Sequence, residues 1–356
     1  TLFPYTTLFR SKKLNAIIYA ILAALFYAVN VPCSKWLLND VTPTFMAAFL
    51  YLGAGAGVGL MYVFHFKKEP SDERIGKKDV PYTLAMVALD IAAPILLMVG
   101  VKLGTAANAA LLGNFEIVAT TLIAFGVFKE KISPGLWGAI SLVTIASIIL
   151  SFSGEGSFSL SIGSAFVIGA TICWGLENNC TRKISGKSTY EIVTIKGIGS
   201  GTGSLVLAVV IGENIPRLSY IAIILMLGFV AYGLSIFTYI RAQKTLGAAK
   251  TSAYYAIAPF VGVALSVVFL KERFTLMFVI ALVIMIIGTV LIVRDTLMHS
   301  HNHTHTHVIT HTHNGSTHTH VIEHSHDHIH VINEGKHGHT HSVAELEMLL
   351  GHSADQ

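Results

Sequence analysis

The sequence predicts an all-α integral membrane protein with ten transmembrane helices arranged as two inverted five-helix repeats. Three observations predict this fold class: long apolar segments recur along the chain, its two halves resemble each other, and charged residues are rare. Hydrophobic residues make up 53% of the 356 residues and charged residues 12%, whereas about 25% charged residues is usual in soluble domains. The polar segments between the apolar ones are too short to cover a soluble helical core, which disfavours that alternative.

Ten apolar segments are long enough to cross a bilayer. A hydrocarbon core about 30 Å thick needs roughly twenty apolar residues per helix. The predicted spans lie at approximately 15–37, 42–65, 80–101, 105–127, 134–153, 160–181, 190–211, 219–240, 249–270 and 275–294.

The two halves of the chain match each other when one is shifted along the sequence relative to the other. At a shift of about 147, four residues near the end of the first span match four near the end of the sixth: Tyr27, Cys33, Ser34 and Lys35 match Trp174, Cys180, Thr181 and Arg182. Farther along, a shift of 142 matches Lys129–Lys131 with Lys271–Arg273. Because each copy has five spans, the second copy enters the membrane from the opposite side, which is typical of transporters that open alternately to two faces.

The predicted organisation has four parts. The first eleven residues resemble the translation of a sequencing adapter, so we expect a non-native segment there and a natural start upstream of Lys12. The parts are an adapter-derived segment (1–11), a first five-helix repeat (12–153), a second five-helix repeat (154–297) and a cytoplasmic histidine-rich tail (298–356).

The basic residues predict the orientation. With both termini in the cytoplasm, sixteen Lys and Arg residues fall in inner segments and four in outer loops, as the positive-inside rule requires. We therefore expect a multi-pass protein of the plasma membrane. The net charge of +4 then reflects topology and does not favour a nucleic-acid partner. The expected partners are the lipid bilayer and a small-molecule substrate, and a homodimer is left open.

Two carboxylates near the middle of predicted spans are the first candidates for substrate binding. A charged group inside a bilayer costs roughly 2.5–3.5 kcal/mol, so Asp90 and Glu116 need a reason to be there. Either could bind a cationic group or carry a proton, and the alternative is a neutral, hydrogen-bonded structural carboxyl. Asn108 and Asn114 share span four with Glu116, and Asn108 lies eight residues before it, on roughly the same helix face.

Further polar candidates lie in spans one, six, seven and nine. The end of span six carries adjacent polar residues that cannot all face lipid, and the predicted Glu177–Lys196 ion pair is either a gate or a neutralised buried charge. The remaining substrate-binding candidates are Asn30, Glu177, Asn178, Lys196, Tyr254 and Tyr255.

Alternating glycines occur at matched places in spans two and seven, namely Gly53, Gly55, Gly57 and Gly59, and Gly197, Gly199, Gly201 and Gly203. No strand–turn–helix context favours a nucleotide-binding loop. Small residues at this spacing let helix backbones approach closely, so we expect the glycines to mark a moving seam between helices, with close packing alone as the alternative.

These features resemble the drug/metabolite transporter superfamily in its ten-span EamA-type branch. The resemblance covers roughly residues 15–295 and depends on the two repeats and on the turns Phe128–Ile132 and Leu270–Phe274. Ala258–Phe260 contains the proline expected before the second turn, whereas the first repeat has Glu116 in that region. The resemblance implies a secondary carrier, often an exporter of amino acids or other small metabolites, with a central cavity, no cofactor and no enzymatic activity.

The tail holds seventeen of the eighteen histidines. Rows of imidazoles suit zinc, nickel, cobalt or copper. Segments 308–313 and 316–321 are near mirror images about Asn314–Gly315, a preferred hairpin turn. This register places His311 opposite His318 and Thr312 opposite Thr317, and it predicts a zinc or nickel site formed by His311, His313, His318 and His320. The alternative is a disordered, solvated segment, which we expect of the tail without metal.

Three functions remain open at this point. The leading one is a metabolite carrier with a metal-binding regulatory tail. The alternative is a carrier of zinc, nickel or cobalt, but the spans contain only His65, at one end. The third is a non-transporting membrane sensor that uses the tail as its receptor.

Overall fold

The computed structural model describes residues 3–65, 73–129, 132–152, 161–184, 186–246, 251, 254–313 and 316–331, with side chains for most residues between Leu14 and Asp295. The chain divides into two compact units. Thr1–Val293 holds the helices, and Arg294–Gln356 holds a β-hairpin.

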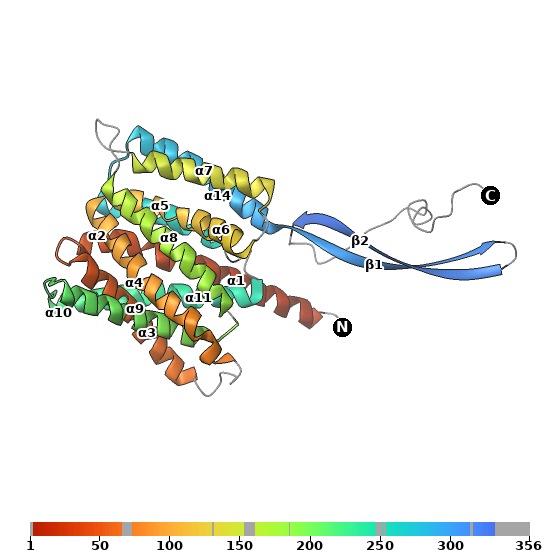
Figure 1. Ribbon diagram of the computed structural model, residues 1–356, viewed down its shortest axis with the longest axis horizontal. Coiled ribbons are helices and arrows are strands. Elements are labelled where there is room, and N and C mark those ends of the chain that lie inside the picture. The colour runs from red at the N-terminus through yellow and green to blue at the C-terminus, as the bar shows by residue number, and fades with distance from the viewer. Residues whose placement is uncertain are drawn as a thin grey trace. The chain divides into compact units, whose positions relative to one another are not determined.

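The first repeat is a series of apolar helices (Figure 1). Span one comprises α1 and α2, spans two and three are α3 and α4, span four comprises α5 and α6, and span five is α7. A short 3-10 turn, η3 (Lys77–Asp79), leads into α4. The bounds are α1 Phe3–Ala28, α2 Asn30–Leu37, α3 Pro43–His65, α4 Val80–Leu103, α5 Ala106–Leu112, α6 Phe115–Phe128 and α7 Pro134–Ser151.

The second repeat follows the same plan. Spans six and seven are α8 and α9, span eight comprises α10, the π-helical turn η4 and α11, span nine contains α13, and span ten is α14. The bounds are α8 Ile162–Lys183, α9 Thr189–Val210, α10 Leu218–Gly228, η4 Phe229–Leu234, α11 Ser235–Leu246, α13 Ala258–Leu270 and α14 Leu276–Leu297.

The predicted all-helical membrane fold is confirmed. Within the described residues, eight segments are long and apolar enough to cross a membrane: Leu14–Leu37, Pro43–His65, Lys77–Leu103, Ala106–Val127, Pro134–Ser151, Thr189–Val210, Leu218–Gln243 and Leu276–Asp295. The two remaining predicted spans contain α8, whose second half is rich in polar side chains, and the shorter apolar helix α13.

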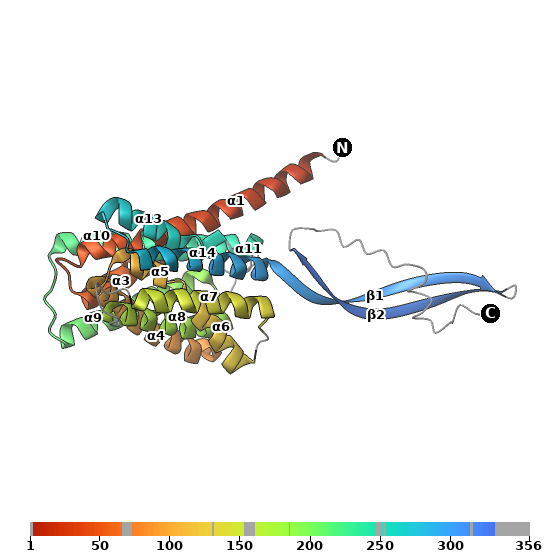
Figure 2. The same cartoon turned by 90° about the horizontal axis from the view of Figure 1, so that it is seen from above.

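The helices pack mainly across the two repeats. Figure 2 shows the helices of the first unit running along a common direction. Contacts join α3 to α9, α4 to α8, α1 to α11 and α5 to α13, and Gly288 of α14 lies against Val143 of α7. Every pair therefore combines one helix of each repeat, as expected for inverted copies related by a two-fold pseudo-symmetry axis.

The alternating glycines of spans two and seven lie against each other and form a glycine seam between α3 and α9. A Cβ atom on Gly197 would lie 2.3 Å from the backbone nitrogen of Gly55, and a Cβ atom on Gly55 would lie 2.5 Å from the nitrogen of Ile198. The two backbones thus touch where glycine leaves room. On the other side of α3, Gly53 approaches the carbonyl oxygen of Leu225 in the same way, at 2.1 Å from an added Cβ.

We predict that Gly197→Ala will force α3 and α9 apart. Overpacking of this kind costs about 1–3 kcal/mol, so the purified variant should unfold at a lower temperature in a detergent thermal melt. Gly138→Ala is the matched control, because nothing lies within 4 Å of a Cβ built there. Equal melting temperatures for the two variants would contradict a close helix crossing.

Several spans are interrupted near their middle. Span one turns at Val29, span four at Gly113–Asn114, and span nine at Ala256–Ile257, just before Pro259. The interruptions in spans four and nine occupy corresponding places in the two repeats, and inverted-repeat transporters use such discontinuous helices to build their binding sites. The proline explains the second interruption, whereas in the first repeat Gly113 and Asn114 form the turn.

Two charged side chains hold the α4–α5 junction. Lys35 Nζ donates to the carbonyl oxygens of Val101, Lys102 and Gly104 at 2.9, 3.1 and 2.6 Å. Glu272 accepts hydrogen bonds from the backbone N–H groups of Ala106 and Ala107 at 2.7 and 2.8 Å. A cation therefore caps the end of α4, and an anion caps the start of α5, as the helix dipoles favour.

The histidine-rich tail contains β1 (Met298–His313) and β2 (Ser316–Val331), which pair antiparallel. The predicted register is confirmed, since His311 is opposite His318 and Thr312 opposite Thr317. Our expectation of a disordered tail is corrected for 298–331, where pairing continues from Met298 opposite Val331 to the turn. The mirror-image sequence pattern predicts a hairpin over 308–321 only, so the paired region in the structure is longer than the predicted one. The turn residues 314–315 and residues 332–356 lie outside the described part.

Candidate substrate site

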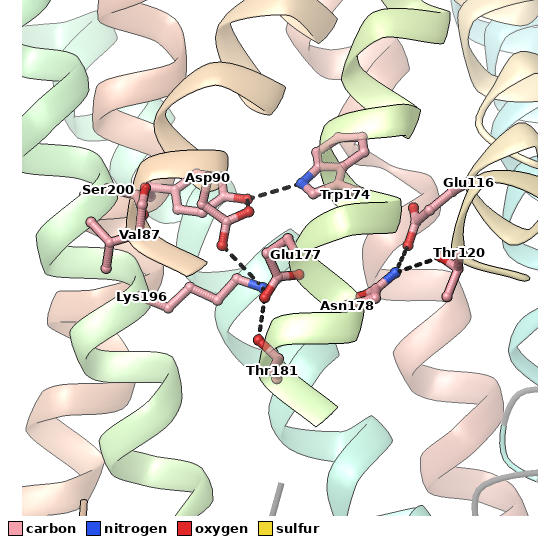
Figure 3. Close-up of polar contacts among 11 residues, drawn as sticks. Val87, Asp90, Glu116, Thr120, Trp174, Glu177, Asn178, Thr181, Lys196 and Ser200 are labelled. Carbon is pink, nitrogen blue, oxygen red and sulfur yellow. Dashed lines mark hydrogen bonds and ion pairs between the residues drawn. The ribbon is translucent and has the colours of Figure 1, made fainter. Parts of the chain in front are cut away.

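A buried ion network lies near the middle of the helical unit (Figure 3). Lys196 Nζ on α9 lies 3.1 Å from Oε1 of Glu177 on α8 and 3.1 Å from Oδ2 of Asp90 on α4. The contact to Asp90 Oδ2 is an ion pair rather than an aligned hydrogen bond. Asp90 and Glu177 are buried and Lys196 is nearly so. We call these three residues the central triad.

Aromatic and hydroxyl groups complete the surroundings of the triad. Tyr51 donates its hydroxyl to Asp90 Oδ1 at 3.0 Å, and Trp174 Nε1 donates to the Tyr51 hydroxyl oxygen at 3.4 Å. Thr181 donates to Glu177 Oε1. Each buried carboxylate therefore has both a cation and a hydroxyl donor, which offsets the cost of removing it from water.

A second polar cluster lies on the opposite side of α8 (Figure 3). Asn178 Nδ2 donates to Oε1 of Glu116 at 2.8 Å and to the hydroxyl of Thr120 at 3.3 Å, both on α6. Helix α8 thus separates the triad from Glu116, because consecutive residues Glu177 and Asn178 point to different sides. All three adjacent polar residues of span six, Glu177, Asn178 and Asn179, are engaged inside the bundle, since Asn179 Nδ2 donates to the carbonyl oxygens of Thr120 and Gly175 at 3.1 and 2.8 Å.

Asn30 connects span one to the triad through two tyrosines. Asn30 Nδ2 donates to the hydroxyl oxygen of Tyr232 at 2.9 Å, and the Tyr232 ring lies 5.1 Å from the Tyr51 ring. Ser34 donates to Asn30 Oδ1 at 3.1 Å. The Ser34–Asn30 pair in the first repeat therefore matches the Thr181–Glu177 pair in the second, at the shift of 147 found in the sequence.

The structure brings together six of the ten residues that the sequence indicated for substrate binding. Five of them form two clusters, and the sixth connects span one to the triad. Asp90, Glu177 and Lys196 form the triad, Glu116 and Asn178 the second cluster, and Asn30 the link through Tyr232. The predicted Glu177–Lys196 ion pair is present. The ring of Tyr255 lies 6.0 Å from that of Tyr27, which in turn lies 5.9 Å from that of Tyr232.

Three candidates lie apart from these clusters. Asn108 donates to Ser164 Oγ at 3.0 Å and to the Leu150 carbonyl oxygen at 3.3 Å, so it joins span four to α7 and α8 rather than to Glu116. Asn114 is buried at the α5–α6 turn and donates to the carbonyl oxygen of Leu111 in α5 at 3.3 Å. Tyr254 is 37% exposed.

Sequence reasoning missed Tyr51, Trp174 and Tyr27 as site residues. Nothing in the local pattern of α3 distinguishes Tyr51 from an ordinary core aromatic. The repeat did contain a usable indication for the others, because Tyr27 and Trp174 occupy matched positions three residues before Asn30 and Glu177.

Within the residues that the structure describes, no group of three or more His, Cys, Asp or Glu side chains is placed to hold a metal ion. The side chains of the predicted tail ligands His311, His313, His318 and His320 lie outside the described part. Their backbone register places all four on one face of the hairpin, since residues directly opposite each other share a face and alternate residues along a strand do too. The metal site remains a prediction.

We predict that Lys196→Met will leave two buried carboxylates without a cation. Removing one partner of a buried ion pair costs about 3–5 kcal/mol, so the variant should lose a large part of its thermal stability in detergent. Lys187→Met is the matched control. Lys187 pairs with Asp79 at 3.8 Å with 29% of its side chain exposed, and such pairs contribute about 0–1 kcal/mol. A similar loss in both variants would contradict the central role of Lys196.

Membrane-spanning helices in two repeats that meet at buried charged clusters define a transporter of the inverted-repeat class. The sequence matches the EamA-like transporter family over residues 14–152 and 161–294. The chain belongs to this family, within the drug/metabolite transporter superfamily, and is a multi-pass membrane transporter rather than an enzyme.

Two relatives share the length of the helical unit. An "Uncharacterized transporter" of Methanothermobacter thermautotrophicus is 24% identical over 301 residues, covering 78% of this chain and 85% of that protein. The "Uncharacterized transporter YyaM" of Bacillus subtilis is 22% identical over 264 residues, covering 72% and 86%. A solved structure titled "Crystal structure of protein" shares the fold, with a TM-score of 0.58, 17% identity and coverage of 78% of this chain and 94% of that one.

Proposed function

We propose that this transporter is a secondary-active carrier that exports a small metabolite such as an amino acid. The observation that supports this most strongly is the central triad, which joins α4 of the first repeat to α8 and α9 of the second. A binding site at the interface of two inverted repeats is reached from either face as the repeats move relative to each other.

The chemistry of the triad suits a zwitterion. Lys196 offers an ammonium group to a substrate carboxylate, and Asp90 or Glu177 offers a carboxylate to a substrate amino group. A bound amino acid would exchange the internal ion pairs for intermolecular ones of the same kind, so the buried charges stay neutralised throughout the cycle. This exchange keeps the energetic cost of binding low in a membrane interior.

The proposed orientation follows from the distribution of basic residues. Of the twenty basic residues assigned to connecting segments, sixteen fall in the segments predicted to lie inside, and the positive-inside rule assigns that side to the cytoplasm. Both termini and the tail, 298–356, then lie in the cytoplasm of a cell whose plasma membrane holds the protein. Glu177 lies in the half of α8 that this orientation places nearer the cytoplasm, and its side chain is buried.

We predict that proteoliposomes containing the purified protein will exchange labelled amino acids by counterflow. Asp90→Asn should reduce exchange by at least about tenfold, because it removes a charge from the triad while keeping the shape of the side chain. Glu73→Gln, outside both clusters, serves as the control for reconstitution. Absence of counterflow with a panel of amino acids and related metabolites, by a protein with a normal thermal melt, would contradict this function.

The tail supports a second, separable role in binding divalent metal ions. On the face that carries the four predicted ligands, the register also places four further His–His pairs: His299–His330, His301–His328, His303–His326 and His305–His324. Imidazole is a good ligand for zinc and nickel. The tail is also the one feature that favours the alternative function, transport of the metal itself, whereas the helical clusters combine carboxylates with lysine.

We predict that the full-length protein will retain zinc or nickel after dialysis and that deletion of residues 298–356 will remove it. Replacing His311, His313, His318 and His320 together by alanine should lower the bound metal measured by elemental analysis. Replacing Thr310, Thr312, Thr317 and Thr319, on the other face, is the matched control. Zinc uptake into proteoliposomes that persists after the deletion would instead favour the metal carrier.

A further inference from the structure

Strands β1 and β2 run side by side over their full length (Figure 1), and all their histidines lie on one face of the hairpin. Residues directly opposite each other on paired antiparallel strands share a face, and so do alternate residues along a strand. Every histidine of β1 has an odd number and every histidine of β2 an even one, and the register pairs odd residues with even ones. We call this the histidine face, and its thirteen histidines are His299, His301, His303, His305, His307, His311, His313, His318, His320, His324, His326, His328 and His330.

The opposite face of β1 and β2 carries no histidine. Its pairs include Ser300 opposite Ile329 and Thr304 opposite Ser325. This segregation depends on the register, because a shift by one residue moves every side chain of one strand to the other face. Alternation within one strand can come from simple repetition of the sequence, whereas a phase that matches in both strands is a property of the paired hairpin.

Two isoleucines divide the histidine face into two groups. Ile309 is opposite His320, and Ile322 is opposite His307, so two successive positions on this face lack a His–His pair. On one side lies the turn group, which consists of the four ligands already predicted, His311, His313, His318 and His320. On the other side four successive pairs form the base group, which consists of His299–His330, His301–His328, His303–His326 and His305–His324.

The spacing within the base group suits metal ions. Opposing Cβ atoms of an antiparallel pair are about 4.5–5.5 Å apart, and the next pair on the same face follows after about 6.6–6.8 Å. Zinc prefers four ligands, with imidazole nitrogens at about 2.0–2.1 Å, so two neighbouring pairs supply one complete set and the base group supplies two. His305 precedes His311 by six residues, or about 20 Å along the strand. Ions in the base and turn groups therefore cannot share ligands.

We infer that the base group is a second metal centre of the tail, which binds two zinc or nickel ions independently of the ion at the turn group. The inference rests on the proposed metal-binding role of the tail and deepens it, because it adds a separate centre and fixes the number of ions. Imidazole nitrogens are good ligands for both metals, and the tail then binds three ions in all.

The base centre has a physical role that the turn group cannot fill. A two-stranded hairpin is marginally stable in water, and the turn stabilises least the pairs that lie farthest from it. Those pairs are Met298–Val331 and the base group. An ion that bridges the two strands there contributes binding free energy to folding only when the strands are paired. Metal at the base therefore stabilises the register over the full length of both strands.

The test counts metal ions on the full-length protein. Purified protein is dialysed to equilibrium against zinc or nickel, and the ions per chain are measured by elemental analysis. We expect about three ions on the wild type, about one after the base group is replaced by alanine, and about two after the turn group is replaced. The matched control replaces four pairs of the opposite face by alanine and should keep all the ions; it changes Ser300, Asn302, Thr304, Thr306, Glu323, Ser325, Asp327 and Ile329.

A permuted variant separates the effect of the histidine face from that of histidine content. It exchanges each base-group histidine of β2 with the residue that follows it, so all the histidines remain but four move to the opposite face. Because each base site then keeps two ligands of four, we expect zinc to bind there at least about tenfold more weakly, with the ion at the turn group retained. The substitutions are His324→Ser, Ser325→His, His326→Asp, Asp327→His, His328→Ile, Ile329→His, His330→Val and Val331→His.

The outcomes distinguish the base centre from the proposed role of the tail. Wild-type zinc binding by the permuted variant would overturn the inference, because histidine content alone would then suffice. Zinc that is lost only when the turn group is replaced would also overturn it, and it would leave the proposed metal-binding role intact. A wild-type protein that binds no metal would contradict both.

Discussion

The position of one ammonium group between two carboxylates constrains the centre of this protein. Lys196 reaches Asp90 and Glu177 at 3.1 Å each, and in a low-dielectric interior none of the three charges is tolerated alone. Because the three side chains come from three spans and from both repeats, satisfying them fixes how α4, α8 and α9 meet.

The glycine seam and the central triad are parts of one arrangement. Gly197 directly follows Lys196, and a Cβ atom built on Gly197 would lie 2.8 Å from the carbonyl oxygen of Tyr51. The close crossing of α3 and α9 therefore brings Tyr51 and Lys196 to the same carboxylate, that of Asp90. Tyr51 donates a hydrogen bond to Asp90, and Lys196 forms an ion pair with it. Backbone contact at the seam thus determines the geometry of the charged cluster.

The two repeats share a fold but differ in chemistry. Asn30 and Ser34 make the same side-chain contact in the first repeat as Glu177 and Thr181 in the second, and the shift of 142 matches Asp90 with Tyr232. The neutral pair formed by Asn30 and Tyr232 therefore occupies the positions that correspond, in the other repeat, to the carboxylates Glu177 and Asp90. This difference gives an otherwise symmetric bundle two chemically unlike halves.

The sequence by itself determined the spans, the repeat, the seam and the hairpin register, because each depends on a period or a local match along the chain. It also selected Asp90, Glu116, Glu177 and Lys196, since charge in an apolar span stands out. Only the tertiary structure decided which of these groups contact each other. It also added Tyr51, Trp174 and Tyr27 to the site, because in the sequence alone these aromatic residues cannot be distinguished from ordinary core residues. Asn108 and Glu116 illustrate the limit: regular helical spacing placed them on one face, but the turn at Gly113–Asn114 changes that spacing and sends them to different partners.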